Sequence, residues 1–483
     1  MRVLFQMRRS YRELGGGDVT VMRRTAEHLR RLGVEVDESC DVESDLSAYD
    51  LVHVIDSAPG EETFLQGMNA LQQGKPLIAT PLYWDTAEYD ERGRWQPAAL
   101  EDPGDPSLAR RLRAARRQVV SAKRRFLVEM ADMVLPSSEG ERRCLQTALS
   151  VEHNRFRVVP FAADEHYAAG SAEEFVQQYG LRDFVLCVAR IEDNKNQLAL
   201  VQVCRRLGLP LVLIGHVHPG YHAYLDACQR AAGDATLLVL PHMDPPRLSS
   251  AYAAAKVHAL VSWVTWFELP ALVTLEAALA GCNIVTDYPG PTGDYLGDLV
   301  WYCDPGDLDS IASAVAAAHA APRTAALRDH VRSRYSWART ARATLDAYHQ
   351  VLAERAAGGP RSASFAEEPG HGLRLLEDLA RAQESHLWLK SLVNEDLSRQ
   401  LAEHKTVLAD RERQLAEHSA VLADRERQLA EHGVILADRE RQLAEHKTVL
   451  ADRERQLAEH KTVLASRERQ LAEDTAVLAD HGV

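Results

Sequence analysis

Two glutamates stand eight residues apart around the start of an apolar segment. Glu268 precedes Pro270, and Glu276 lies within the run that ends at Gly281. Proline is favoured at a first helical position and glycine just past a helix end, so we predict a helix over about 270–280. Free N–H groups at a helix start favour a phosphate, and nearby carboxylates can accept hydrogen bonds from sugar hydroxyls. The pattern alone also fits a buried amphipathic helix with a solvated glutamate at each end.

Two cations follow a predicted buried strand at 184–188. Arg190 and Lys195 come directly after it, where the next helix begins. Such cations suit a diphosphate, because negative charge grows on that group when the bond from a sugar's anomeric carbon to phosphate oxygen breaks, and fixed donors stabilise it. Taken alone, they could equally be ordinary loop charges.

A glycine run follows the first predicted strand. Residues 1–6 read as a buried strand, Gly15, Gly16 and Gly17 come next, and a helical pattern then ends near Gly33. The run is not GxGxxG and no ribose-binding acid follows at the proper strand end, which disfavours an NAD-dependent oxidoreductase. The glycines could form part of a ligand site or be only a flexible turn.

Short apolar runs bounded by turn residues recur along the first 335 residues and alternate with helical patterns. This alternation predicts parallel sheets, hence an α/β fold with two Rossmann-like, doubly wound domains. We expect domains at 1–165 and 166–335, a hinge within 161–180 and a closing helix at 336–355. Ligands of such sheets bind beyond the strands' carboxyl ends, so a cleft between the facing domains is the expected site. The further strands are expected at 49–55, 76–80, 132–136 and 158–160, then at 211–214, 236–240, 259–261, 283–286 and 299–302.

The C-terminal part is a repeat. Residues 356–372 have the composition of a linker, and we predict a helical tail over 373–483, with fourteen-residue repeats at about 401–480 and a leucine every seventh residue. A strict seven-residue period is typical of a coiled coil, so the chain is expected to form a homo-oligomer through this tail. With leucine at d, the a positions are polar, as at Lys405 and Glu412, which leaves a solvated or partly disordered helix as the alternative.

Composition excludes several classes of protein. A formal net charge of −14 argues against a nucleic-acid binder. The seven cysteines form no CxxC pair, and no segment resembles a secretory signal or a membrane span, so we expect a cytoplasmic protein without a structural metal.

A basic segment at 108–127 departs from the acidic average. It combines eight arginines and lysines with apolar residues at helical spacing. Such a helix could lie on an anionic membrane surface, which would place the protein peripherally at the inner face of the membrane. The alternative, which the apolar spacing favours, is a domain helix with its apolar stripe in the core and its arginines in water.

The order of several short motifs carries a resemblance to a known family. They are the glycines at 15–17, ADMVLPSSE at 131–139, VVP at 158–160, VAR at 188–190 with Lys195, FE at 267–268, LEAALAG at 275–281 and YSW at 335–337. On this order, residues 1–355 resemble the GT-B retaining glycosyltransferases of glycosyltransferase family 4. The tail lies outside the resemblance.

The resemblance implies a role for each candidate residue. Arg190 and Lys195 would bind the donor diphosphate, Glu268 the donor sugar, and Glu276 the nucleotide ribose, with Gly15, Gly16 and Gly17 forming a wall near the phosphates. Glu268, Arg190 and Lys195 are the expected catalytic residues, and no metal or other cofactor is expected. The sequence departs from the family at 269–271, which lacks its glycines, and at 81–85, which lacks its histidine. Tyr83, Trp84 and Asp85 there could bind a sugar or belong to the core.

The sequence therefore predicts a retaining glycosyltransferase of the hexosyl type. It would move a sugar from a UDP- or GDP-linked donor to a glycan or lipid-linked acceptor, as in polysaccharide biosynthesis. The alternative is a catalytically weak or inactive scaffold of the same fold that assembles partners through its tail.

Overall fold

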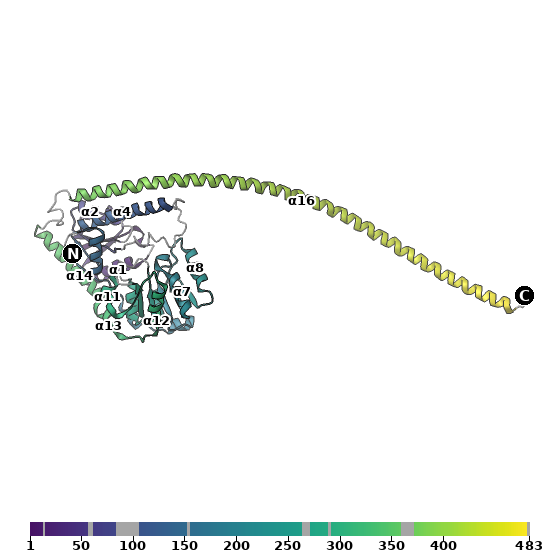
Figure 1. Cartoon of the computed structure of the whole chain (residues 1–483), viewed down its shortest axis with the longest axis horizontal. Helices are drawn as coiled ribbons and strands as arrows, with labels where there is room; N and C mark the ends of the chain where they lie inside the picture. The colour runs from purple at the N-terminus through teal and green to yellow at the C-terminus, as the bar shows by residue number, and fades with distance from the viewer. Residues whose placement is uncertain are drawn as a thin grey trace. The chain divides into compact units, whose positions relative to one another are not determined.

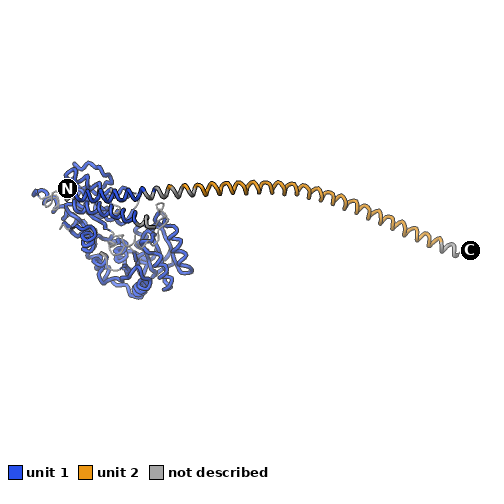
Figure 2. The backbone as a smooth tube through the Cα atoms, turned by 45° about the horizontal axis from the view of Figure 1, so that its top comes forward, with its two compact units in different colours: residues 1–395 blue, residues 396–483 orange. Residues whose placement is uncertain are grey.

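A computed structural model describes residues 1–12, 15–56, 61–83, 106–151, 155–262, 271–287, 291–358 and 371–480. The chain forms two compact units, residues 1–395 and residues 396–483, coloured separately in Figure 2. The first unit contains two parallel sheets with their helices, and the second is helical (Figure 1).

The first sheet has the strand order β2-β1-β3-β4-β5, with every pair parallel. Edge strand β2 was not anticipated, because only Val36 of its five residues is buried. The predicted strand at 158–160 is wrong. The preceding Phe156 forms an isolated parallel bridge with Val134 of β5, and Val159 N–H donates to the Pro136 carbonyl at 2.8 Å, but proline at 136 and 160 removes donors that a longer ladder needs. The strands are β1 (Arg2–Gln6), β2 (Glu35–Ser39), β3 (Leu51–Ile55), β4 (Leu77–Thr80) and β5 (Met133–Val134).

The second sheet contains all six strands expected from the sequence, in the order β11-β10-β9-β6-β7-β8 and again all parallel. Its central strands are fully buried, as expected for a sheet with helices on both faces. The predicted α/β class with two Rossmann-like sheets is confirmed. The strands are β6 (Val185–Val188), β7 (Leu211–Ile214), β8 (Leu237–Leu240), β9 (Val257–Leu260), β10 (Asn283–Asp287) and β11 (Trp301–Cys303).

Helices connect successive strands in both sheets. Those of the first are α1 (Gly17–Arg31), α2 (Glu61–Gln72), α4 (Pro106–Met130) and α5 (Glu139–Ala148), with the short η1 (Arg9–Arg12). Those around the second are η2 (Glu165–Ala169), α6 (Glu173–Tyr179), η3 (Asp193–Lys195), α7 (Gln197–Leu207), α8 (His222–Ala232), α9 (Pro245–Ala254), α10 (Leu272–Ala280), α11 (Pro291–Leu296), η4 (Gly297–Leu299), α12 (Leu308–Ala320) and α13 (Ala325–Arg334).

Helix α14 (Trp337–Ala356) returns from the second sheet to the first, where it lies beside α1 (Figure 1). Trp337 and Leu345 are buried with Phe5 in one apolar cluster. The Tyr348 hydroxyl lies 2.6 Å from Nδ1 of the buried His53, whose Nε2 lies 2.8 Å from the Thr80 hydroxyl. The closing helix therefore ties the two halves of the first unit together.

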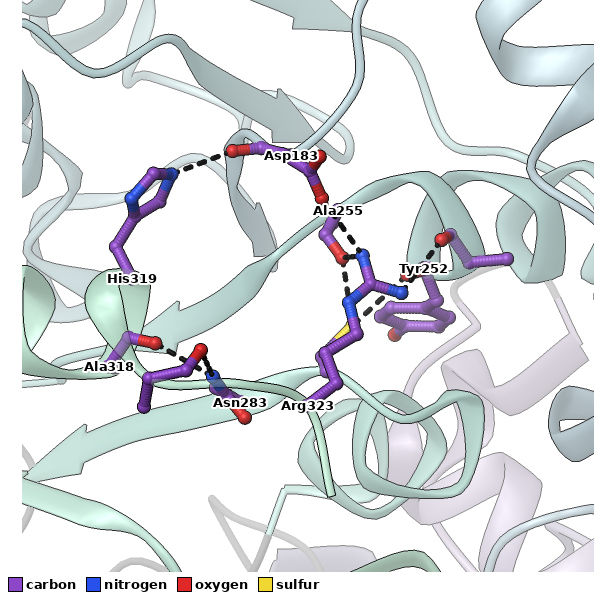
Figure 3. Close-up of polar contacts among 10 residues, drawn as sticks. Asp183, Tyr252, Ala255, Asn283, Ala318, His319 and Arg323 are labelled. Carbon is purple, nitrogen blue, oxygen red and sulfur yellow. Dashed lines mark hydrogen bonds and ion pairs between the residues drawn. The ribbon is translucent and has the colours of Figure 1, made fainter. Parts of the chain in front are cut away.

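The amino ends of the second sheet's strands are held by Arg323 (Figure 3). Its guanidinium donates to the Ala253 carbonyl at 3.1 Å and to the Ala255 carbonyl, and lies 3.6 Å from the Asp183 carboxylate. Nearby, Asn283 donates to the Ala318 carbonyl at 2.7 Å. These contacts occupy the edge where β6, β9 and β10 begin, so the opposite, carboxyl edge is left for a site.

Helix α16 (His371–Asp480) begins in the first unit and continues as the second. In the first unit Leu375 packs with Phe126 and Met130 of α4, and the Arg111 guanidinium lies 5.8 Å from the Trp388 ring centre. No helix in the described part of the chain is both long and apolar enough to cross a membrane.

Candidate functional site

The second sheet reverses its strand order between β6 and β9. From β6 the chain proceeds to β7 and β8 on one side, whereas β9, β10 and β11 follow on the other. In open α/β sheets a ligand crevice forms at such a switch point, outside the carboxyl ends of the strands. The loop after β6 carries Arg190 and Lys195, and α10 with Glu276 follows β9. The fold therefore brings these three predicted residues to neighbouring strand ends.

The first sheet has its own switch point, between β1 and β3. The segment after β1 carries the three glycines, which lead directly into α1. A Cβ atom on Gly17 would lie 4.0 Å from Cδ1 of Leu272, the first residue of α10. The glycine segment therefore lies against the start of the helix that carries Glu276, as a site between the two sheets requires.

The three glycines are not required by backbone conformation. None lies in the left-handed region that favours glycine, and Gly16 is extended at φ 171°. A side chain at Gly16 would meet the Asp18 carboxylate at 2.6 Å, whereas at Gly15 it would meet no atom within 4 Å. A side chain would therefore fit at position 15, whereas at position 16 the Asp18 side chain would have to move.

Arg8 is a site candidate that sequence reasoning missed. It directly follows β1 in the same way that Arg190 follows β6, and it forms an ion pair of 2.7 Å with Asp18. Both side chains are largely buried, and the Arg8 guanidinium lies beside Gly16. A cation directly after the first strand was the signal that could have identified it.

The loop after β6 is held rigidly. Asn196 adopts a left-handed conformation at φ 55° and donates to the Pro305 carbonyl at 3.0 Å, and Gln197 donates to the Arg190 carbonyl at 2.7 Å. Arg190 is 48% exposed and pairs with the buried Glu192 at 2.9 Å, and Lys195 is half-buried at the end of η3. The Arg190 guanidinium is thus oriented while it remains accessible.

Gly215 lets the loop after β7 approach the loop after β6. A Cβ atom there would lie 1.9 Å from the Ala189 carbonyl oxygen, which no side chain could accommodate. The backbones pair across this point, with Ile191 N–H donating to the His216 carbonyl at 2.8 Å. Gly215 therefore fixes the position of the segment that carries Arg190.

Glu276 lies in a largely apolar setting among tyrosines. Burial raises the pKa of Glu276 to about 7, opposed by the hydrogen bond that the Tyr252 hydroxyl donates at 3.1 Å. The negative charge of Asp164 raises this pKa further. Asp164 in turn pairs with Arg24 of α1, whose Nε lies 2.9 Å from its carboxylate. Sequence reasoning missed Tyr252 and Asp164, because they lie far from Glu276 in the chain.

Other predicted residues fall elsewhere. Glu268, Trp84 and Asp85 lie outside the described residues. Tyr83 is buried beside the first sheet, and the Arg124 guanidinium lies 5.5 Å from the centre of its ring. Of its two predicted alternatives, the structure shows Tyr83 as a core residue.

The basic segment forms most of α4, and its cations differ in exposure. Arg124 is buried and pairs with the buried Asp56 at 3.2 Å, and Lys123 is also buried. Arg111 and Arg116 are exposed. Part of the segment is therefore structural. Over the described ranges, no three or more His, Cys, Asp or Glu side chains are grouped to hold a metal ion.

No family model and no curated protein matches the sequence. Solved structures do match in fold. Sucrose-phosphate synthase from Thermosynechococcus elongatus matches with a TM-score of 0.58 and 17% identity, over 73% of this chain and 99% of that one. A glycosyltransferase from Rickettsia africae ESF-5 gives 0.52 and 12%, over 73% and 98%. Anabaena Alr3699/HepE in complex with UDP and glucose gives 0.51 and 15%, over 74% and 99%. The first unit has the GT-B fold of these glycosyltransferases.

Proposed function

We propose that the protein is a retaining glycosyltransferase that uses a UDP- or GDP-linked sugar as donor. The observation that supports the proposal is that the Arg190 loop and the Glu276 helix follow neighbouring strands at the switch point of the second sheet, with Gly17 beside the first residue of that helix. The fold alone would not suffice, because one fold hosts many functions. The proposal is supported by the chemistry of these residues, which follow the carboxyl ends of the strands, where such sheets bind ligands.

In this proposal each residue acts on one part of the donor. Arg190 and Lys195 bind the diphosphate, and they stabilise the charge that grows on it as the bond to the anomeric carbon breaks. Glu276 accepts hydrogen bonds from the ribose hydroxyls, and Glu268 contacts the transferred sugar. Gly15, Gly16 and Gly17 leave room for the phosphates beside the start of α10. No metal is needed, because cationic side chains and N–H groups supply the positive charge.

A donor screen with a matched pair of variants tests this assignment. Nucleotide sugars at about 100 times their dissociation constant should add about 2.7 kcal/mol of stability, seen as a thermal shift. We expect Arg190→Ala to weaken UDP or GDP binding at least tenfold, because a charge-assisted contact to phosphate is lost. Arg206→Ala should bind as the wild type does, since Arg206 lies at the far end of α7 and pairs with Asp309. Equal binding by both variants would contradict the assignment.

The stereochemical outcome needs its own measurement. NMR of the first product formed from an α-linked donor should show an α-linked product, as retention requires. A β-linked product would reject the retaining mechanism while leaving donor binding intact.

The scaffold alternative predicts a different result. A protein that only assembles partners would show neither sugar transfer nor donor hydrolysis across the panel, and Glu268→Ala would change neither binding nor activity.

Other expectations from the sequence remain predictions. They are a glycan or lipid-linked acceptor, membrane contact through the exposed arginines of α4 and a cytoplasmic location. The same holds for the domain boundaries at 165 and 335 and for the linker at 356–372, which also remain predictions.

A further inference from the structure

The tail helix carries a long row of exposed leucines. They recur every seventh residue of the second unit, and 58–69% of each is exposed. Monomeric proteins rarely leave a continuous apolar surface of this length uncovered. The row therefore marks an interaction surface. Its members are Leu408, Leu415, Leu422, Leu429, Leu436, Leu443, Leu450, Leu457, Leu464 and Leu471.

The apolar face is centred on this row. An alanine follows each leucine, and a valine or, at 435, an isoleucine precedes alternate leucines, so apolar residues lie about 100° to either side. The third and fourth residues after each leucine flank it more closely, at about 50° on opposite sides. After Leu408 these are Arg411 and Glu412. One flank alternates arginine with histidine, and the other carries glutamate in every second heptad.

Ion pairs within the helix use a different set of charges. Arg413 pairs with Asp410 at 3.8 Å, and the same pair recurs in the next three repeats, on the side of the helix away from the leucines. The flanking charges form no such pair within the described tail. They are Arg411, Arg425, Arg439, Arg453 and Arg467 on one flank and Glu412, Glu426, Glu440, Glu454 and Glu468 on the other.

We propose that this surface binds the tail of a second copy of the chain in a parallel, in-register pair. The row extends over about 95 Å at 1.5 Å per residue, so a partner must repeat its apolar residues every seventh position over that length. A second copy of the chain meets this requirement, because its tail has the same seven-residue repeat over the same length. Burying a leucine removes on the order of 60–120 Å² of apolar surface, so ten approach the roughly 800 Å² per partner of a stable interface.

The flanking charges favour the parallel arrangement. In a parallel pair facing each other along the leucines, the glutamate flank of one helix lies against the arginine flank of the other on both sides. Glu412 then meets Arg411 of the second copy. In an antiparallel pair, arginine would face arginine and glutamate would face glutamate. A shift by seven residues would place Glu412 opposite a histidine such as His418, and the pairing of opposite charges would be lost.

Cysteine cross-linking of the full chain tests the orientation. The tail has no cysteine, and of the seven in the chain all but Cys40 are buried, so Cys40→Ser gives a clean background. Leu422→Cys and Leu457→Cys each replace one residue of the row, about equally far from its centre. Each variant by itself should form a covalent dimer on mild oxidation, because facing positions in such a pair lie within disulfide reach. Light scattering should give twice 53.7 kDa. A monomer, or cross-links that form only when the two variants are mixed, would overturn the parallel pair.

A charge test examines the flanks. Changing the five flanking glutamates to arginine should raise the dimer dissociation constant at least tenfold, because both flanks then become basic. Changing Arg413, Arg427, Arg441 and Arg455 to glutamate, on the opposite side, is the matched control and should leave the constant within about twofold. Equal effects of the two sets would contradict the pairing of flanks. None of these readouts depends on the proposed reaction, so failure of either proposal is recognised separately.

Discussion

At the scale of single residues, Glu276 combines binding chemistry with a cost to stability. Its carboxylate is placed to accept hydrogen bonds, yet burial raises the pKa of Glu276 to about 7 from an ordinary value of 4.5. The folded protein therefore holds a proton at Glu276 between pH 4.5 and 7 that the unfolded chain releases. Through this group, stability is greatest below pH 4.5 and falls as the pH rises through 7.

Glu276→Gln should thus stabilise the protein at high pH. The amide cannot ionise and can still accept the Tyr252 hydroxyl hydrogen bond, so the variant avoids a cost of about 3 kcal/mol at pH 8. We expect the difference in melting temperature, variant minus wild type, to increase between pH 5 and pH 8. The exposed Glu174→Gln should show no such increase. A difference independent of pH would show that the raised pKa is wrong.

At the scale of elements, the site depends on two loops that must pass very close to each other. Gly215 permits this approach, and the bond from Ile191 to the His216 carbonyl fixes it. The cations therefore lie on a segment whose position is set by a different strand. This support explains how a surface loop can orient Arg190 without burying it.

Gly215→Ala should destabilise the protein by about 3 kcal/mol or more, because the added methyl overlaps the Ala189 carbonyl and the loops must separate. Gly180→Ala is the matched control, since Gly180 has φ 68° but open space around it, and should cost about 1 kcal/mol. Denaturant unfolding would measure both. Similar losses in the two variants would show that the close approach is not important.

At the scale of the whole molecule, the proposed donor site and the proposed association surface belong to different units, residues 1–395 and residues 396–483. Leu375, near the start of α16, packs with Phe126 and Met130 of α4 within the first unit. Association through the tail, as proposed above, would join two GT-B units in one assembly.

A chain ending at Glu395 should accordingly keep its fold and lose its association. We expect its melting temperature to stay within about 2 °C of the full chain at low protein concentration, because the leucine row contributes no buried core to the first unit. Its mass by light scattering should be that of a monomer. A large fall in melting temperature would show that residues beyond 395 stabilise the GT-B unit.

The sequence by itself determined the architecture. Runs such as 211–214 are apolar throughout and lie between helical patterns, so their hydrophobicity was enough to predict strands of a buried parallel sheet. The polar edge strand β2 was not predicted, because an edge strand needs little apolar surface. The strand predicted at 158–160 does not form, because Pro136 and Pro160 lack the N–H groups that a longer ladder needs. The leucine period likewise identified the long helix.

Only the tertiary structure decided which distant segments become neighbours. Arg190 and Glu276 are far apart in sequence, and their strands become neighbours only when the order reverses between β6 and β9. Tyr252, Asp164 and Arg8 acquire their roles through packing, which no local pattern encodes. The same is true of Arg124, which looked like a surface charge and proved to be a buried partner of Asp56, because burial depends on the neighbours that the fold supplies.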